Sequence, residues 1–138
     1  MNPALLICAL LLSTAAVAAP PKTHFEDHST QSLISSDDAK KLMAENIPAK
    51  VWKVYPAAKY SMLSQVEGGM TANGTCVVTA RVMQLTRTQA VRAVLFRPQS
   101  TATAFDAIAS ATLEQCRALA RTKLKEATEA VVSDLVKR

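Results

Sequence analysis

The sequence predicts an α+β fold: an N-terminal helix, a three- to four-stranded antiparallel meander, and a long C-terminal helix packed on one face of the sheet. Two observations carry this prediction. Residues 75–85 alternate between apolar and other side chains, as a half-buried strand does, and apolar residues recur at helical spacing from residue 105 to residue 135. The order helix, strands, helix is typical of helices packed on one side of a small sheet.

The N-terminal helical segment is expected over residues 35–55. Ser35 is a suitable N-cap, and two acidic residues follow in the first turn, where the helix dipole favours negative charge. Pro48 interrupts the apolar pattern, so two alternatives stay open: one helix kinked at Pro48, or two short helices that end before Pro56.

The meander is expected to contain strands at residues 60–67, 75–85 and 89–96. Asn73-Gly74 lies between the first two strands and is a strong hairpin signal. Alternation places one set of side chains of the second strand on a common apolar face, namely Cys76, Val78, Ala80 and Val82.

The long C-terminal helix is expected from residue 103 to about residue 136. Thr103-Ala104-Phe105-Asp106 resembles a capping box at its start. The apolar stripe that follows at about 3.6 residues per step comprises Phe105, Ile108, Thr112, Cys116, Leu119 or Ala120, Leu124, Ala127, Val131 and Leu135.

Cys76 and Cys116 are predicted to form a disulfide. Cys76 lies on the apolar face of the clearest strand and Cys116 on the apolar stripe of the long helix, so packing the helix on that face points the two sulfurs toward each other. In the chain-entropy model, closing a loop of this length stabilises the fold by about 4 kcal/mol.

Residues 1–18 are expected to be a cleaved signal peptide, because an uncharged apolar run is followed by small residues in an A-x-A pattern. Residues 19–34 are expected to be a flexible tail, and residues 35–138 a single α+β domain with no membrane span after cleavage. The alanine-rich leader and the disulfide indicate an exported bacterial protein, periplasmic or extracellular.

No side-chain constellation predicts an enzyme. His24 and His28 are the only histidines, and they fall in the expected tail, so catalytic residues, a metal site and cofactors are all predicted to be absent. Three glycines are too few for a glycine-rich phosphate loop.

The surface charge gives the sequence its best binding hypothesis. The chain has a net charge of +5 and no acidic residue between Glu67 and Asp106, although four arginines occur there: Arg81, Arg87, Arg92 and Arg97. Arginine suits carboxylate and phosphate groups, so an uncovered sheet face is predicted to bind an anionic envelope component or an acidic protein. Trp52 is a second residue that is predicted to contact the partner; the alternative interpretation is that its side chain is buried in the core. Nucleic acid is not expected, because aromatic residues are few.

Three short pieces of the chain resemble the C-terminal domain of TonB-type energy transducers: Tyr55-Pro56, Glu67-Gly68 ahead of a β run, and Phe105-Asp106-Ala107 read as the start of a helix. The distance between the first two is longer than in that family, and a helix takes the place of the terminal strand. No functional residue is carried over from the resemblance.

Together these observations predict a small exported envelope protein that acts as a non-enzymatic binding or adaptor module, inhibitor-type modules included, through a basic sheet face. The alternative is a structural protein that self-associates through its sheet edge or its long helix.

Overall fold

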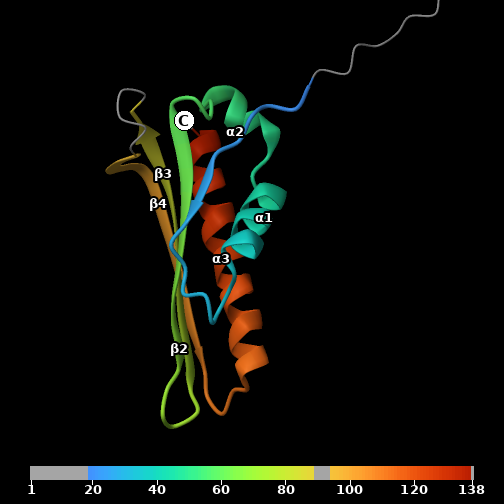
Figure 1. The fold of residues 1–138 in the computed structure, drawn as a ribbon, viewed down its shortest axis with the longest axis vertical. Helices are drawn as coiled ribbons and strands as arrows, with labels where there is room; N and C mark the ends of the chain where they lie inside the picture. Colours follow the sequence, from blue (N-terminus) through green and yellow to red (C-terminus); the bar gives the residue numbers. More distant parts are fainter. Residues whose placement is uncertain (1–18, 89–93, 138) are drawn as a thin grey trace, which may run out of the picture.

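A computed structural model describes residues 19–88 and 94–137, which form one sheet with helices on a single face (Figure 1). The elements in chain order are β1 (Phe25–Asp27), α1 (Ser36–Asn46), α2 (Ala49–Val54), β2 (Tyr60–Met70), β3 (Cys76–Arg87), β4 (Val94–Ile108) and α3 (Leu113–Lys137). The mixed α+β class and the long C-terminal helix packed on the sheet are as predicted. The leader predicted over residues 1–18, and Arg92 with its neighbours at 89–93, lie outside the described residues.

The sheet has the strand order β1-β2-β3-β4 and is mixed, so the prediction of a purely antiparallel sheet was wrong. The pairs β2–β3 and β3–β4 are antiparallel, but β1 runs parallel to β2. The β2–β3 hairpin turns at the predicted Asn73-Gly74. Gly74 has φ +76°, a left-handed conformation that glycine adopts without steric cost.

Part of the segment predicted to be a flexible tail is a strand of this sheet. Asp27 holds β1 against β2, because its Oδ1 accepts hydrogen bonds from Ser64 Oγ at 2.7 Å and Ser29 Oγ at 2.5 Å. The backbone N–H of His28 donates to the Ser64 carbonyl at 2.9 Å. These β2 partners lie more than thirty residues away in sequence, which is why local periodicity did not reveal the strand.

The N-terminal helical segment consists of two helices and not of one kinked helix. In α1, the Ser35 hydroxyl accepts from the Asp38 N–H at 3.1 Å, which is the N-cap arrangement. Ile47 is its C-cap, and Pro48 is the N-cap residue of α2. Proline cannot continue α1 but can precede the first turn of a new helix.

The predicted start of the long helix was wrong by ten residues. Residues 103–108 belong to β4, which pairs with β3 without interruption from Ser100, opposite Gln84, to Ile108, opposite Cys76. The helix begins at Leu113, after a reciprocal capping box: the Gln115 N–H donates to Thr112 Oγ1 at 3.2 Å, and the Thr112 N–H donates to Gln115 Oε1 at 2.8 Å. Phe105-Asp106-Ala107 therefore lies in a strand, which removes the helix start from the TonB resemblance.

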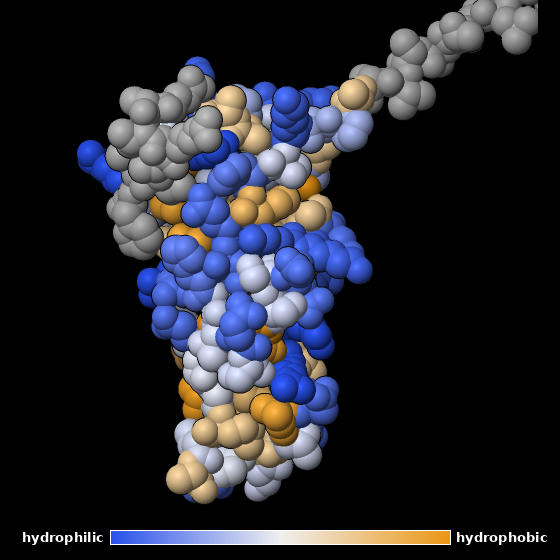
Figure 2. All heavy atoms as spheres, in the orientation of Figure 1, coloured by the Kyte–Doolittle hydropathy of each residue, from blue (hydrophilic) through white to orange (hydrophobic). Residues whose placement is uncertain are grey.

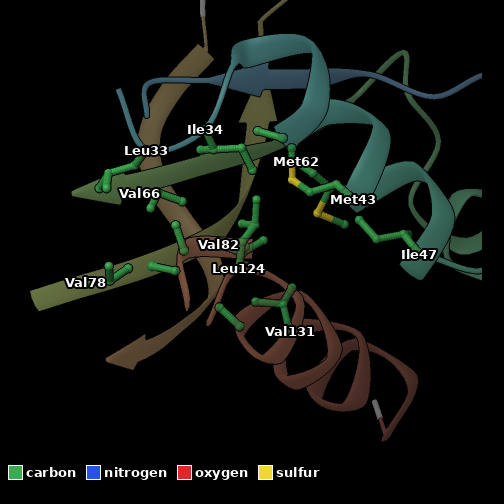
Figure 3. Packing of buried hydrophobic residues seen from close by; sticks show 14 of the residues in the cluster. Leu33, Ile34, Met43, Ile47, Met62, Val66, Val78, Val82, Leu124 and Val131 are labelled. Carbon is green, nitrogen blue, oxygen red and sulfur yellow. The ribbon is translucent and has the colours of Figure 1, made fainter. Parts of the chain in front are cut away.

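The core lies between the sheet and the helices (Figure 3). β3 contributes its predicted apolar face, and α3 contributes seven of the predicted stripe residues, Cys116, Leu119, Ala120, Leu124, Ala127, Val131 and Leu135. Met43 of α1 and Met62 of β2 extend the same core toward β1. By contrast, Phe105 and Ile108 are exposed, because they are in β4 and not in α3.

The disulfide joins Cys76 and Cys116 as predicted, with their Cα atoms 5.5 Å apart. It links the first residue of β3 to the first turns of α3, and both cysteines are fully buried. The bond therefore fixes one end of the helix to the sheet face that the helix covers.

Replacing Cys76 with serine is expected to lower the free energy of unfolding by about 4 kcal/mol, since the cross-link restricts the unfolded chain. Thermal and denaturant unfolding of the oxidised protein would measure the loss. Cys116→Ser should give a similar loss, and adding it to Cys76→Ser should cost little more. Wild-type protein whose stability is unchanged by a reductant that cleaves the bond would contradict this account.

Candidate functional site

The outer edge of β4 is the best candidate for a binding site. The Thr71 N–H donates to the Thr75 carbonyl at 2.8 Å at one end of the β2–β3 pair, and the Arg87 N–H donates to the Lys59 carbonyl at 2.8 Å at the other. Thr75 and Arg87 are both odd-numbered, and the backbone groups of successive residues in a strand point to opposite neighbours. The backbone N–H and carbonyl groups of odd-numbered β3 residues therefore hydrogen-bond to β2, and those of even-numbered residues hydrogen-bond to β4.

The register then decides which groups of β4 point outward. Val82 lies opposite Ala102 and Ala80 opposite Ala104, so these even-numbered residues of β4 bond to β3. The N–H and carbonyl groups of Thr101, Thr103 and Phe105 point to the other side, where the sheet has no further strand among the described residues. β4 thus presents a row of free backbone donors and acceptors.

Side chains of the same three residues lie on the sheet face opposite the helices. The even-numbered side chains of β4 face α3: Ser100 Oγ donates to Asp134 Oδ2 at 2.7 Å, and Asp106 Oδ2 lies 3.3 Å from Lys123 Nζ. The odd-numbered ones point away, and Phe105 is 77% exposed. We call the backbone edge and outward side chains of Thr101, Thr103 and Phe105 the β4 edge.

Both ends of the β4 edge are defined. At one end, Pro98 follows a register shift in the pairing with β3. At the other, Asp106 Oδ1 accepts from the Ala107 N–H at 2.8 Å. This hydrogen bond, and then the Lys123 ammonium, lower the pKa of Asp106. Between these ends the strand has no proline or lysine, the residues that commonly protect sheet edges.

Exposed large apolar residues gather at the hairpin end of the molecule, on both faces of the sheet. Val77 and Phe105 lie on the face away from the helices, Met70 and Ile108 lie on the helix face, and Leu113 begins α3. In the space-filling view this lower end is mostly white, tan and orange, whereas the middle of the molecule is mainly blue (Figure 2). Exposed apolar groups at the rim of a free edge favour contact with another protein.

The described structure leaves Arg81 apart from Arg87 and Arg97 in the predicted arginine platform, and Arg92 lies outside the described residues. Arg81 is exposed on the face away from the helices, but Arg87 lies six residues further along β3, about 20 Å away at the rise of a strand. The Arg87 guanidinium donates to the Ala57 carbonyl. Arg97 is exposed on β4, six residues from Thr103, the partner of Arg81. Arg81 therefore acts separately from Arg87 and Arg97 at physiological salt, whereas Arg97 lies between the partners of Leu85 and Thr86, at the same end of the sheet as Arg87.

Trp52 is not a surface contact. It is 3% exposed and packs edge-to-face on Phe25, with ring centroids 5.4 Å apart. Its role is to hold β1 against α2, which corresponds to the core alternative and removes Trp52 from the candidate binding residues.

The fold brings together one histidine and one serine that sequence reasoning kept apart. His24 Nδ1 lies 2.9 Å from Ser61 Oγ and 3.9 Å from Glu26 Oε1. A catalytic triad needs serine and acid on opposite ring nitrogens, whereas here both lie at Nδ1. Ser61 is also fully buried, out of reach of a substrate. The arrangement ties β1 to β2 and is not a nucleophile-base pair.

A polar cleft of about 310 Å³ lies between residues 31–35 and the start of α3, where Arg117 and Arg121 line it. Both arginines have partners. Arg117 is 2.8 Å from Glu114 and donates to the Ser32 carbonyl, and Arg121 is 3.5 Å from Asp38. The cleft therefore offers little free positive charge for an anion.

Within residues 19–88 and 94–137, no group of three histidine, cysteine or acidic side chains is arranged to hold a metal ion. None of the helices in this part of the chain combines the length and the hydropathy needed to cross a membrane.

No protein-family model matches the sequence, and no curated protein is significantly similar to it. Several solved structures share a similar arrangement of elements. A PelC dodecamer from Paraburkholderia phytofirmans is 12% identical with a TM-score of 0.42, over 82% of this chain and 88% of that chain. A candidate lipoprotein from Caulobacter crescentus is 12% identical with a TM-score of 0.36, over 82% and 88%. A DUF330 protein from Xanthomonas campestris is 10% identical with a TM-score of 0.33, over 86% and 85%. At this level of similarity the likenesses carry no information on function.

The environment of His24 leads to a pH prediction. Partial burial and then the charge of Arg87 lower its pKa, and Glu26 opposes them. As the pH falls through about 6.5, the ordinary histidine pKa, the unfolded chain takes up a proton that the folded chain does not, so stability falls. His24→Gln should show a smaller loss of unfolding free energy between pH 7.5 and pH 5.5 than wild type.

Denaturant titrations at several pH values would measure this difference. His28→Gln, which removes an exposed histidine, is the matched control for loss of a histidine in general. Equal pH dependence in wild type and His24→Gln would contradict the predicted contribution of His24.

Proposed function

We propose that this protein is an exported, non-enzymatic binding module that engages its partner by strand addition at the β4 edge. The observation that carries the proposal is the row of outward backbone groups at Thr101, Thr103 and Phe105, next to exposed apolar side chains. In strand addition, main-chain hydrogen bonds supply affinity, and alternate side chains of the added strand supply specificity.

Export is supported by two independent features of the chain. The apolar leader pattern of residues 1–18 is that of a signal peptide. The buried Cys76–Cys116 disulfide belongs to an oxidising compartment such as the periplasm or the extracellular space.

The non-enzymatic character is supported by the geometry of the one histidine-serine pair. His24 has both Ser61 and Glu26 at the same ring nitrogen, and Ser61 is buried. A general base has to reach the proton that it removes from a reacting group, and a nucleophile has to reach the substrate.

The expected salt dependence of binding distinguishes strand addition at the β4 edge from binding through the arginines of the sheet face. A partner recognised by scattered arginines would bind through screened point charges, whose contribution falls with salt. A partner recognised at β4 binds through backbone hydrogen bonds along a stretch with no charged side chain from Gln99 to Phe105. Binding at the edge should therefore depend only weakly on ionic strength.

Thr103→Pro is the variant that tests strand addition. Because the Thr103 N–H points away from β3, proline removes no bond within the sheet, and prolines are tolerated on edge strands. The change leaves an added strand with one unpaired carbonyl, at a cost of about 1–3 kcal/mol. We expect binding to weaken about tenfold or more.

The probe is a labelled synthetic peptide with the sequence of residues 99–108 and lysines added at both ends, followed by fluorescence anisotropy. Thr103→Val, which keeps the N–H, is the matched control and should retain the affinity of wild type. A scrambled peptide controls for non-specific binding. Equal affinity of the peptide for wild type and Thr103→Pro would refute strand addition at β4, because loss of one outward backbone donor would then have no effect.

A further inference from the structure

We infer that the strand added at the β4 edge is β4 of a second copy of this chain, in an antiparallel register that places Thr103 opposite Thr103 of the other copy. This inference rests on the strand addition proposed above and names its partner. It is carried by the positions of the free backbone groups, the side-chain types on each face and the absence of charge.

The free backbone groups are symmetric about Thr103. Thr101 and Phe105 lie two residues to either side of it, and all three point outward. With Thr103 on a two-fold axis, Thr101 of each copy faces Phe105 of the other. Every pair is then of the hydrogen-bonded kind, in which both residues exchange N–H and carbonyl bonds. A shift of one residue would place outward groups opposite groups already bonded to β3.

The side chains brought together in this register suit one another on the face away from the helices. Thr103 would meet Thr103, and Phe105 would meet Thr101 across the two strands. Pairs of two threonines, and pairs of an aromatic with a β-branched residue, are among those that stabilise antiparallel sheets. Phe105, which is 77% exposed in the single chain, would gain a neighbour along the added strand.

The side chains on the helix face allow the strands to approach. Ala102 of one copy would lie opposite Ala104 of the other, in the narrower non-hydrogen-bonded pairs. Both alanines are only partly buried in the single chain. Because the two-fold axis is perpendicular to the sheet, the helices of both copies would lie on the same side of one continuous sheet.

Electrostatics does not oppose the pairing although each chain carries a net charge of +5. No charged side chain occurs from Gln99 to Phe105. Asp106 would face Ser100 of the other copy, not a second acidic residue, and its own copy's Lys123 lies 3.3 Å away. Like charges placed opposite each other would have been destabilising.

Sedimentation velocity over a concentration series tests the second copy as the partner. The protein is purified after export, as wild type, Thr103→Pro and Thr103→Val. We expect a dimer of wild type and of Thr103→Val at micromolar concentration, and a dissociation constant about tenfold or more larger for Thr103→Pro. Circular dichroism and thermal unfolding check that each variant is folded.

Cysteine cross-linking tests the register. Two residues in a hydrogen-bonded pair have Cα atoms about 5.5 Å apart, within the range of a disulfide. Under mild oxidation Thr103→Cys should form a cross-linked dimer, and a mixture of Thr101→Cys with Phe105→Cys should form the mixed dimer. Thr79→Cys, on the same face of β3 but one strand further in, is the matched control and should not cross-link.

The outcomes separate this inference from the proposed function. A chain that stays monomeric but binds the β4 peptide in a manner lost in Thr103→Pro would overturn the second copy as partner and leave strand addition standing. A dimer insensitive to Thr103→Pro would place self-association elsewhere and overturn the inference. Cross-linking of Thr103→Cys no faster than that of Thr79→Cys would overturn the register.

Discussion

The packing of α3 across β3 and β4 is the interaction on which the rest of the structure depends. It buries the even-numbered side chains of β3 against the apolar stripe of the helix, and the Cys76–Cys116 disulfide fixes one end of this contact. Because successive side chains of a strand alternate between faces, covering one face assigns every odd-numbered residue to the other. The covered face thereby determines which side chains lie on the other, where Leu63, Met83 and Leu85 form a second buried cluster and Arg81 is exposed.

The two edges of the sheet are treated differently. Residues 24–30, which precede α1, run alongside the outer edge of β2. The carbonyl of His24 accepts a hydrogen bond from the Met62 N–H at 3.0 Å, and the Thr30 N–H donates to the Val66 carbonyl at 2.8 Å. These bonds cover the part of β2 that flanks the core. Among the described residues no strand performs this role for β4, although it is the longest strand. An edge left open while the other is covered at the cost of ordering a segment is consistent with a role in recognition.

Among the described residues the positive charge is distributed over the surface. Arg81 lies about six residues along the sheet from Arg87, and Arg117 and Arg121 of α3 are paired with carboxylates. The net charge of +5 therefore acts as a diffuse field that affects solubility and encounter rates, but not the geometry of binding. In the proposed strand addition, directional recognition comes from backbone groups, which no count of charged residues can reveal.

The sequence by itself determined the fold class, the β2–β3 hairpin, the apolar face of β3 and the disulfide, because each follows from local periodicity, turn chemistry or the pairing of two cysteines. It did not locate β1, whose partners lie in β2 more than thirty residues on. It also assigned residues 103–108 to a helix, since Phe105 and Ile108 fit a helical spacing and the segment from Thr103 to Asp106 resembles a capping box. The Thr-Ala alternation of residues 101–104 was the local signal for a strand, yet only pairing with β3 over its full length decided between the two. The free edge exists because of that pairing, so only the tertiary structure, through non-local hydrogen bonds, placed the candidate site.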